Sequence, residues 1–88
     1  MSNVISLKLE VHDYFGKTIA IYTKYIESDF TPHKDMIFEE ADYTLTAKNI
    51  YFDLADGCVF VRFAEYLRKD EQEDVWDFLK KHDWNKVK

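Results

Sequence analysis

Apolar residues occupy every second position from Ile5 to Val11, and polar residues fill the positions between them. This period of two predicts a β-strand with one buried face. Residues 13–16 then predict a turn, because Gly16 tolerates the positive φ that a tight turn requires. Residues 18–26 predict a second strand, and both of its faces are partly apolar, which is typical of a strand covered on both sides.

Residues 27–42 show the least regular pattern of the chain. Pro32 interrupts any strand, whereas Thr31-Pro32 is typical of a helix that begins with a capping threonine and a first-turn proline. We therefore favour a short helix within residues 31–40. A short edge strand at residues 36–38 is the alternative.

Extended segments return after this region. Residues 43–47 and 49–54 predict strands, and the Asp56-Gly57 pair predicts the turn of a hairpin that leads into residues 58–63. Both faces of residues 58–63 are apolar. This strand is therefore expected in the middle of a sheet.

The pattern changes to a helical period in the last part of the chain. Val75, Phe78 and Leu79 fall on one stripe, which predicts an amphipathic helix over about residues 70–83. Asp70 is the expected cap of this helix.

The predicted fold class is α+β. An antiparallel sheet of four to five strands packs one face against the C-terminal α-helix, in one small domain that spans residues 1–88. The share of hydrophobic residues is 47%, which is enough for a core in a chain of this length.

Charge is unevenly distributed along this acidic chain, whose formal net charge is −5. Residues 35–77 hold twelve acidic and four basic side chains, whereas residues 1–34 hold four of each. A surface this acidic repels phosphate groups. The composition therefore argues against direct binding to nucleic acid or to an anionic membrane.

Carboxylates are concentrated in the predicted helix at spacings of three and four residues. Like charges at this spacing destabilise a helix by about 0.2–0.5 kcal/mol per pair. They form either a solvated helix face or a contact surface for a basic partner. The second interpretation predicts partner-binding residues at Asp70, Glu73, Asp74 and Asp77, extended by Glu39, Glu40 and Asp42.

Aromatic residues are the second unusual feature, at 17% of the chain. Those in turns or at element ends are expected to be partly exposed, and exposed aromatic side chains rimmed by charge are typical of protein interfaces. The candidate aromatic anchors are Tyr14, Phe15, Tyr66 and Trp84.

Motifs that carry catalysis or bind metals are missing from the sequence. The histidines and Cys58 have no metal-ligand spacing, and Cys58 begins an apolar strand, which favours a small buried side chain over a nucleophile. We predict no catalytic residue, no cofactor and no metal. The single cysteine and the lack of a long apolar run predict a cytoplasmic protein, in a bacterial or a host cell.

In size, acidity and strand-plus-helix layout, the chain is similar in physical type to phage anti-defence proteins and bacterial toxin-immunity proteins. This likeness assigns no role to any residue. The leading hypothesis is a small acidic protein-binding module, encoded by a phage or mobile element, that acts as an inhibitor or immunity-type protein. It would mimic nucleic acid and block a basic partner protein, such as a nuclease.

Two alternatives remain open. Strand faces that are apolar on both sides favour a structural or oligomer-building subunit, including a homodimer. The other alternative is a small enzyme that uses surface carboxylates. Because salt screens charged contacts far more than apolar ones, salt dependence separates the leading hypothesis from an apolar oligomer.

Overall fold

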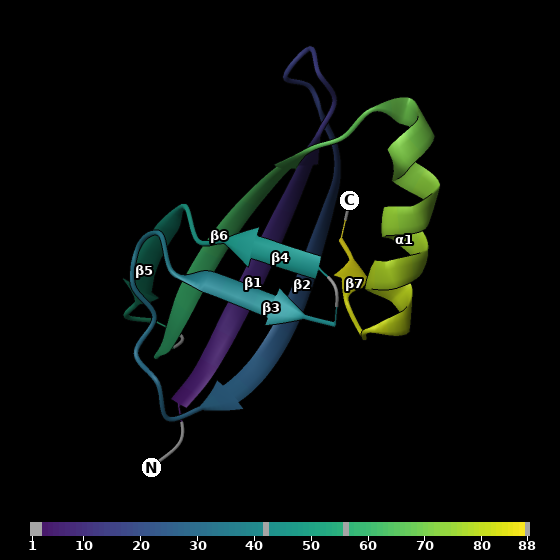
Figure 1. The fold of residues 1–88 in the computed structure, drawn as a ribbon. Coiled ribbons are helices and arrows are strands. Elements are labelled where there is room, and N and C mark those ends of the chain that lie inside the picture. The colour runs from purple at the N-terminus through teal and green to yellow at the C-terminus, as the bar shows by residue number, and fades with distance from the viewer. Residues whose placement is uncertain (1–2, 42, 56, 88) are drawn as a thin grey trace.

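The structure, a computed structural model, describes residues 3–41, 43–55 and 57–87. It contains a twisted sheet, a separate two-stranded hairpin and one C-terminal helix (Figure 1), so the predicted α+β class is confirmed. The elements in chain order are β1 (Asn3–His12), β2 (Thr18–Ser28), β3 (Ile37–Glu40), β4 (Tyr43–Thr46), β5 (Asn49–Asp53), β6 (Cys58–Tyr66), a 3-10 turn (Lys69–Glu71), α1 (Gln72–Lys81) and β7 (Asn85–Lys86).

The main sheet has the order β5-β6-β1-β2-β7, with β1 at its centre. β1 pairs antiparallel with β2 but parallel with β6. The sheet is therefore mixed, and the prediction of a wholly antiparallel sheet is wrong at this pair. Parallel neighbours need a long connection, and the chain forms the β3–β4 hairpin and β5 before it returns beside β1. The alternation of apolar and polar residues within one strand cannot show that two strands distant in sequence pair in parallel.

Residues 31–40 form no helix, which corrects the favoured prediction for this region. Their last four residues are β3, which pairs antiparallel with β4, so the alternative of a short strand is the better one. Phe38 of β3 packs edge-on against Phe63 of the main sheet, with 5.1 Å between ring centroids. Packing against the sheet therefore outweighs the local helix-start signal at Pro32.

One face of the main sheet carries the hydrophobic core. α1 covers this face beside β2, and the β3–β4 hairpin lies across it (Figure 1). Trp76 of α1 stacks on Tyr22 of β2, with 5.5 Å between the rings. The buried core residues are Ile5, Leu7, Leu9, Val11, Ala20, Tyr22, Leu45, Ala47, Val61, Phe63, Leu67, Val75, Leu79 and Trp84.

A polar cluster joins β2, the hairpin and the end of α1. The ammonium group of Lys24 forms an ion pair with Glu40 and donates a hydrogen bond to the backbone oxygen of His82 at 2.8 Å. Glu40 also accepts a hydrogen bond from the indole nitrogen of Trp84 at 2.9 Å. We call Lys24, Glu40 and Trp84 the polar clamp. It ties together three elements that are distant in sequence.

The start of the helix differs from the prediction. A 3-10 turn precedes α1, and Glu71, which accepts hydrogen bonds from Arg68, makes the capping contact in place of Asp70. Glu71 Oε1 accepts hydrogen bonds from the backbone nitrogen of Arg68 at 3.4 Å and from its Nε at 3.1 Å. In the part of the chain that the structure describes, no helix is long and apolar enough to span a membrane.

Candidate functional site

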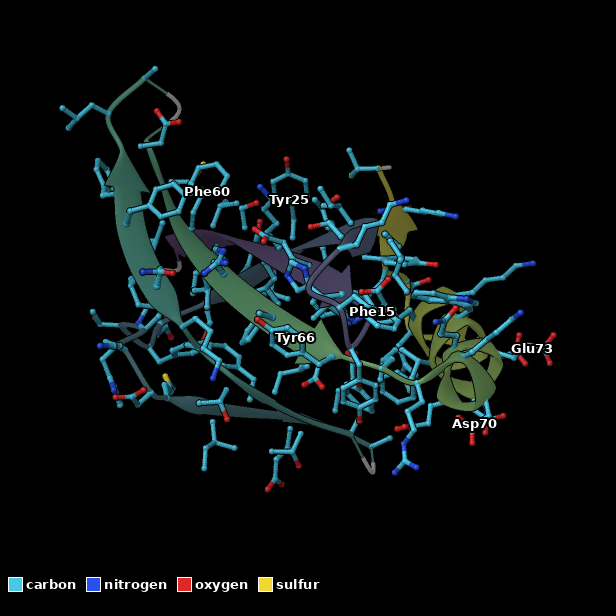
Figure 2. The ribbon with its side chains drawn as sticks, turned by 90° about the horizontal axis from the view of Figure 1, so that it is seen from above. Phe15, Tyr25, Phe60, Tyr66, Asp70 and Glu73 are labelled. Atoms are coloured by element: carbon cyan, nitrogen blue, oxygen red, sulfur yellow. The ribbon has the colours of Figure 1, made fainter. Side chains whose placement is uncertain are left out.

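Exposed carboxylates line the outward side of α1 and of the turn before it. We call Asp70, Glu73, Asp74 and Asp77 the acidic ridge, and all four residues are exposed. Figure 2 shows Asp70 and Glu73 pointing away from the sheet. The helix buries Leu79 on its other side, so the ridge takes no part in the core.

The helical carboxylates of the ridge, Glu73, Asp74 and Asp77, form no ion pairs within the described part of the chain. The neighbouring carboxylate of Glu71 differs, because it is held by Arg68 at 3.1 Å. The three helical carboxylates of the ridge therefore face solvent as a row of negative charge.

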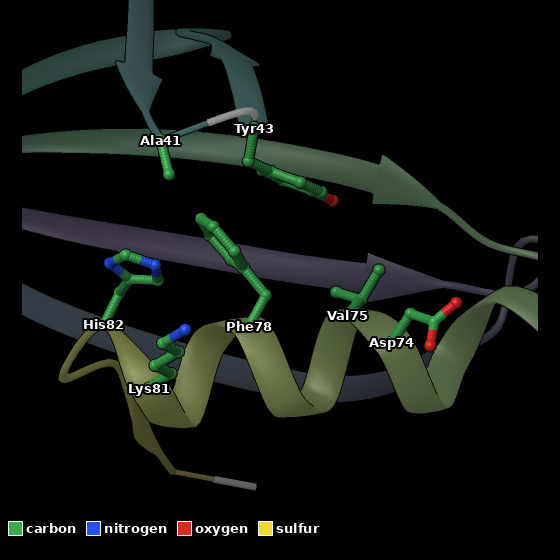
Figure 3. Close-up of a pocket in the computed structure, with 7 residues that line it drawn as sticks. All are labelled: Ala41, Tyr43, Asp74, Val75, Phe78, Lys81 and His82. Carbon is green, nitrogen blue, oxygen red and sulfur yellow. The ribbon is translucent and has the colours of Figure 1, made fainter.

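A groove of about 360 Å³ runs between α1 and the turn of the β3–β4 hairpin (Figure 3). The ring of Phe78 forms its floor, stacked on Tyr43 at 5.0 Å and lying 4.4 Å from the ring of His82. Asp74 lies at one end of the groove, so the groove opens directly onto the ridge. The lining residues are Ala41, Tyr43, Asp74, Val75, Phe78, Lys81 and His82.

Tyr43 forms a neutral wall of this groove. Burial, together with the negative charges of Glu65 and Glu71, raises the pKa of Tyr43 to about 12. The phenol therefore keeps its proton at neutral pH and remains a hydrogen-bond donor. The groove thus combines an aromatic floor, a hydroxyl donor and a carboxylate at its mouth.

The hairpin carboxylates predicted to extend the ridge have different surroundings. Glu39 is exposed on β3, whereas Glu40 belongs to the polar clamp and already has two internal partners. Burial alone would raise the pKa of Glu40, but hydrogen bonds from Lys24 and Trp84 outweigh it and leave the pKa below its usual value. Asp42 lies outside the described residues. The partner contacts of Glu39 and Glu40 stay predictions.

Three of the four candidate aromatic anchors are exposed. Tyr14 is 62% exposed, Phe15 is 96% exposed and Tyr66 is 55% exposed. Tyr14 and Phe15 share a hollow with Arg68 at the start of α1, which brings them near the ridge. Tyr66 instead stacks on His12 on the face of the sheet away from the hairpin.

Trp84 is the exception among these anchors, because only 6% of it is exposed. This burial does not suit an exposed anchor. The chain turns back after α1, where Asp83 has a φ of 64°, and the backbone N–H of Trp84 bonds to the oxygen of Leu79 at 2.9 Å. This turn carries the indole into the core, where Glu40 accepts its N–H.

Exposed aromatic residues also occur where the sequence analysis named no anchor. Tyr25 of β2 is 66% exposed, and Tyr51 and Phe52 of β5 are 48% and 57% exposed. For Tyr25, the signal was the apolar character of both faces of residues 18–26, which we interpreted as a strand covered on both sides. Tyr51 and Phe52 lie on β5, an edge strand.

Among the described residues, no group of three or more histidine, cysteine, aspartate or glutamate side chains is placed to hold a metal ion. Cys58 is half-buried at the start of β6. Comparisons with protein-family models, with curated proteins and with solved structures find no significant match to this chain.

Proposed function

We propose that this protein is a small acidic binding module that occupies the basic surface of a nucleic-acid-binding protein, as an inhibitor or immunity-type protein does. The observation that carries the proposal is the acidic ridge beside the aromatic groove. Glu73, Asp74 and Asp77 are exposed and form no ion pair among the described residues. A nuclease with an arginine- and lysine-rich surface is the expected class of partner.

The spacing of the ridge supports a partner that normally binds phosphate groups. Side chains three and four residues apart on a helix have Cβ atoms about 5–6 Å apart. The ridge is thus a row of closely spaced negative charges, as the phosphates of a nucleic acid strand are. Such a row attracts a basic surface at long range and speeds the encounter with it.

The groove adds an apolar and aromatic contact surface to the charges of the ridge. The apolar stem of a lysine or arginine from the partner would enter the groove beside Phe78, whose ring already packs on Tyr43 and His82, and its charged head would reach the carboxylate of Asp74. A charge-assisted hydrogen bond to Asp74 then fixes the geometry. The ridge would therefore govern association, and the groove would hold the complex.

Capture from lysate with matched variants tests this proposal. The ridge variant is Glu73→Gln, Asp74→Asn and Asp77→Asn. The control variant is Glu27→Gln, Asp29→Asn and Asp35→Asn, which removes the same number of exposed carboxylates from β2 and the loop after it. Asparagine tolerates the φ of 68° at position 35.

We expect the immobilised wild type and the control variant to retain the same basic protein from a bacterial lysate, and the ridge variant to lose it. Equal retention by all three proteins would contradict the proposal. Equal loss by both variants would contradict it too, because the net charge alone would then govern binding.

A further inference from the structure

We propose that β5 is a dimerisation edge, on which a second copy of this chain pairs its own β5 in antiparallel fashion with Tyr51 at the two-fold axis. The two sheets would then form one continuous sheet across the molecular boundary. This inference does not depend on the identity of the basic partner proposed above.

The position of β5 in the sheet provides the first argument. β5 pairs with β6 on one side, and within the described ranges no strand pairs with its other side. Every second N–H and C=O group of an edge strand points outward and can pair with another chain. The opposite edge of the sheet differs, because β7 and the 2.7 Å hydrogen bond from Val87 N–H to the oxygen of Ile21 cover part of β2.

The side chains of β5 provide the second argument. Tyr51 is 48% exposed on one face, Phe52 is 57% exposed on the other, and Leu54 just beyond the strand is 90% exposed. The segment Asn49–Asp53 holds no lysine, arginine or proline, the residues that commonly protect edge strands from pairing. The ring of Tyr51 is already fixed, stacked on Phe60 at 5.2 Å with only 3° between the planes.

The order of residues in β5 makes the strand complementary to itself. An antiparallel pair centred on Tyr51 places Ile50 opposite the partner's Phe52, so an apolar pair forms on each side of the axis. Asn49 then lies opposite the partner's Asp53. The side-chain oxygen of Asn49 accepts a hydrogen bond from Arg62 Nη1 at 2.7 Å, which leaves the amide NH₂ as the group that meets the carboxylate. This register places no like charges opposite each other.

The location of β5 also keeps the acidic parts of two copies apart. β5 and α1 lie on opposite sides of the molecule (Figure 1), so pairing through β5 leaves the two acidic ridges at the far ends of the dimer. Even the shortest extent of the molecule is 23 Å. Charges at such separations are screened at physiological salt, where the Debye length is about 8 Å. Repulsion between two chains of net charge −5 is therefore weak in this arrangement.

Cross-linking through an introduced thiol tests the register. Both test proteins carry Cys58→Ser. One adds Tyr51→Cys, and the matched control adds Tyr25→Cys, which replaces another exposed tyrosine, on β2. Facing residues of antiparallel strands have Cα atoms about 4.5–5.5 Å apart, within the range that a disulfide spans. We expect the Tyr51→Cys protein to form a disulfide-linked dimer in oxidised glutathione, and the Tyr25→Cys protein to stay monomeric.

Light scattering at increasing protein concentration gives an independent measurement. The wild type should reach the mass of a dimer, and Phe52→Lys should remain a monomer with an unchanged melting temperature, because lysine protects an edge without disturbing the core. A wild type that remains monomeric at submillimolar concentration would overturn the proposal. Cross-linking of the Tyr25→Cys protein as fast as the Tyr51→Cys protein would overturn it as well, since contact would then be nonspecific.

Discussion

The two sides of helix α1 differ in burial and in charge. On the inner side, Leu79 is fully buried and Val75 is 7% exposed, both packed in the core. On the outer side, Glu73 and Asp77 are exposed and form no ion pair among the described residues. The fold requires the inner side. The outer side holds like charges at spacings that weaken a helix, and the helix dipole offsets part of this cost in the first turn.

Two carboxylates elsewhere in the molecule differ from those of the ridge, because they form ion pairs within the fold. Glu40 is held by Lys24 and Trp84 in the polar clamp, and Glu10 is held by Arg62 at 2.8 Å. The hydrogen bond from Arg62 lowers the pKa of Glu10 despite partial burial. These carboxylates connect parts of the fold, whereas Glu73, Asp74 and Asp77 form no ion pair with any described residue.

A substitution on the inner side of α1 should cause the largest loss of stability. Leu79→Ala removes a fully buried side chain, and we expect the free energy of unfolding to fall by about 2–5 kcal/mol. Urea denaturation measures this loss. The adjacent exposed position supplies the control, and Lys80→Ala should stay within about 0.5 kcal/mol of the wild type. Similar losses at both positions would mean that the helix is not docked by one side.

A substitution in the polar clamp should cause a smaller loss of stability. Glu40→Gln keeps an oxygen to accept the Trp84 N–H but removes the charge that faces the half-buried Lys24, so we expect a loss of about 1–3 kcal/mol. Glu39→Gln, one residue away and exposed, should change the free energy of unfolding by less than about 0.5 kcal/mol. If both variants unfold at the same urea concentration, the clamp does not stabilise the fold.

The clamp also predicts how stability depends on pH. The pKa of Glu40 is lowered in the folded protein, so the unfolded chain binds its proton first as the pH falls. The stabilisation from this carboxylate is therefore complete above the unfolded pKa near 4.5 and is lost as the pH falls through the lower folded pKa. Burial raises the pKa of Glu65, whose contribution has the opposite sign.

Urea denaturation between about pH 3 and pH 6 checks this sign. We expect the loss of stability on acidification to be shallower in Glu40→Gln than in the wild type. A steeper loss in the variant would show that Glu40 is not stabilised as a carboxylate in the fold.

Neutralising the ridge should have the smallest effect on stability. In the ridge variant, relief of repulsion between neighbouring carboxylates offsets the lost interaction with the positive end of the helix dipole. We expect the free energy of unfolding to change by less than about 0.5 kcal/mol, with an unchanged far-ultraviolet circular dichroism spectrum. A loss above about 1 kcal/mol would make the ridge a structural feature and remove the contrast between the two sides of α1.

The parts of this fold that depend on local pattern are the parts that the sequence predicts well. The alternation in β1, the hairpin turn at Gly57 and the stripe through Leu79 each arise within a short stretch of chain. The parallel β1–β6 pairing and β3 depend instead on residues far apart in sequence. Such contacts leave no periodic signal.

One part of the candidate site could likewise be predicted from the sequence, and another part could not. The acidic ridge follows from spacing on a helix, so its residues could be named from the sequence. The groove could not, because it exists only where the hairpin turn meets α1 and Tyr43 stacks on Phe78. The burial of Trp84 also depends on tertiary structure, since the turn at Asp83 that buries it follows the helix without a glycine.

The affinity of the captured basic partner, measured by calorimetry over a series of salt concentrations, tests the central claim most directly. We predict that the ridge variant binds more weakly than the wild type and with a flatter salt dependence, since fewer charge pairs remain to be screened. The control variant, with the same net charge, should keep the affinity and salt dependence of the wild type. If the ridge variant binds as the wild type does, or if both variants weaken equally, the acidic ridge is only a solvated helix face.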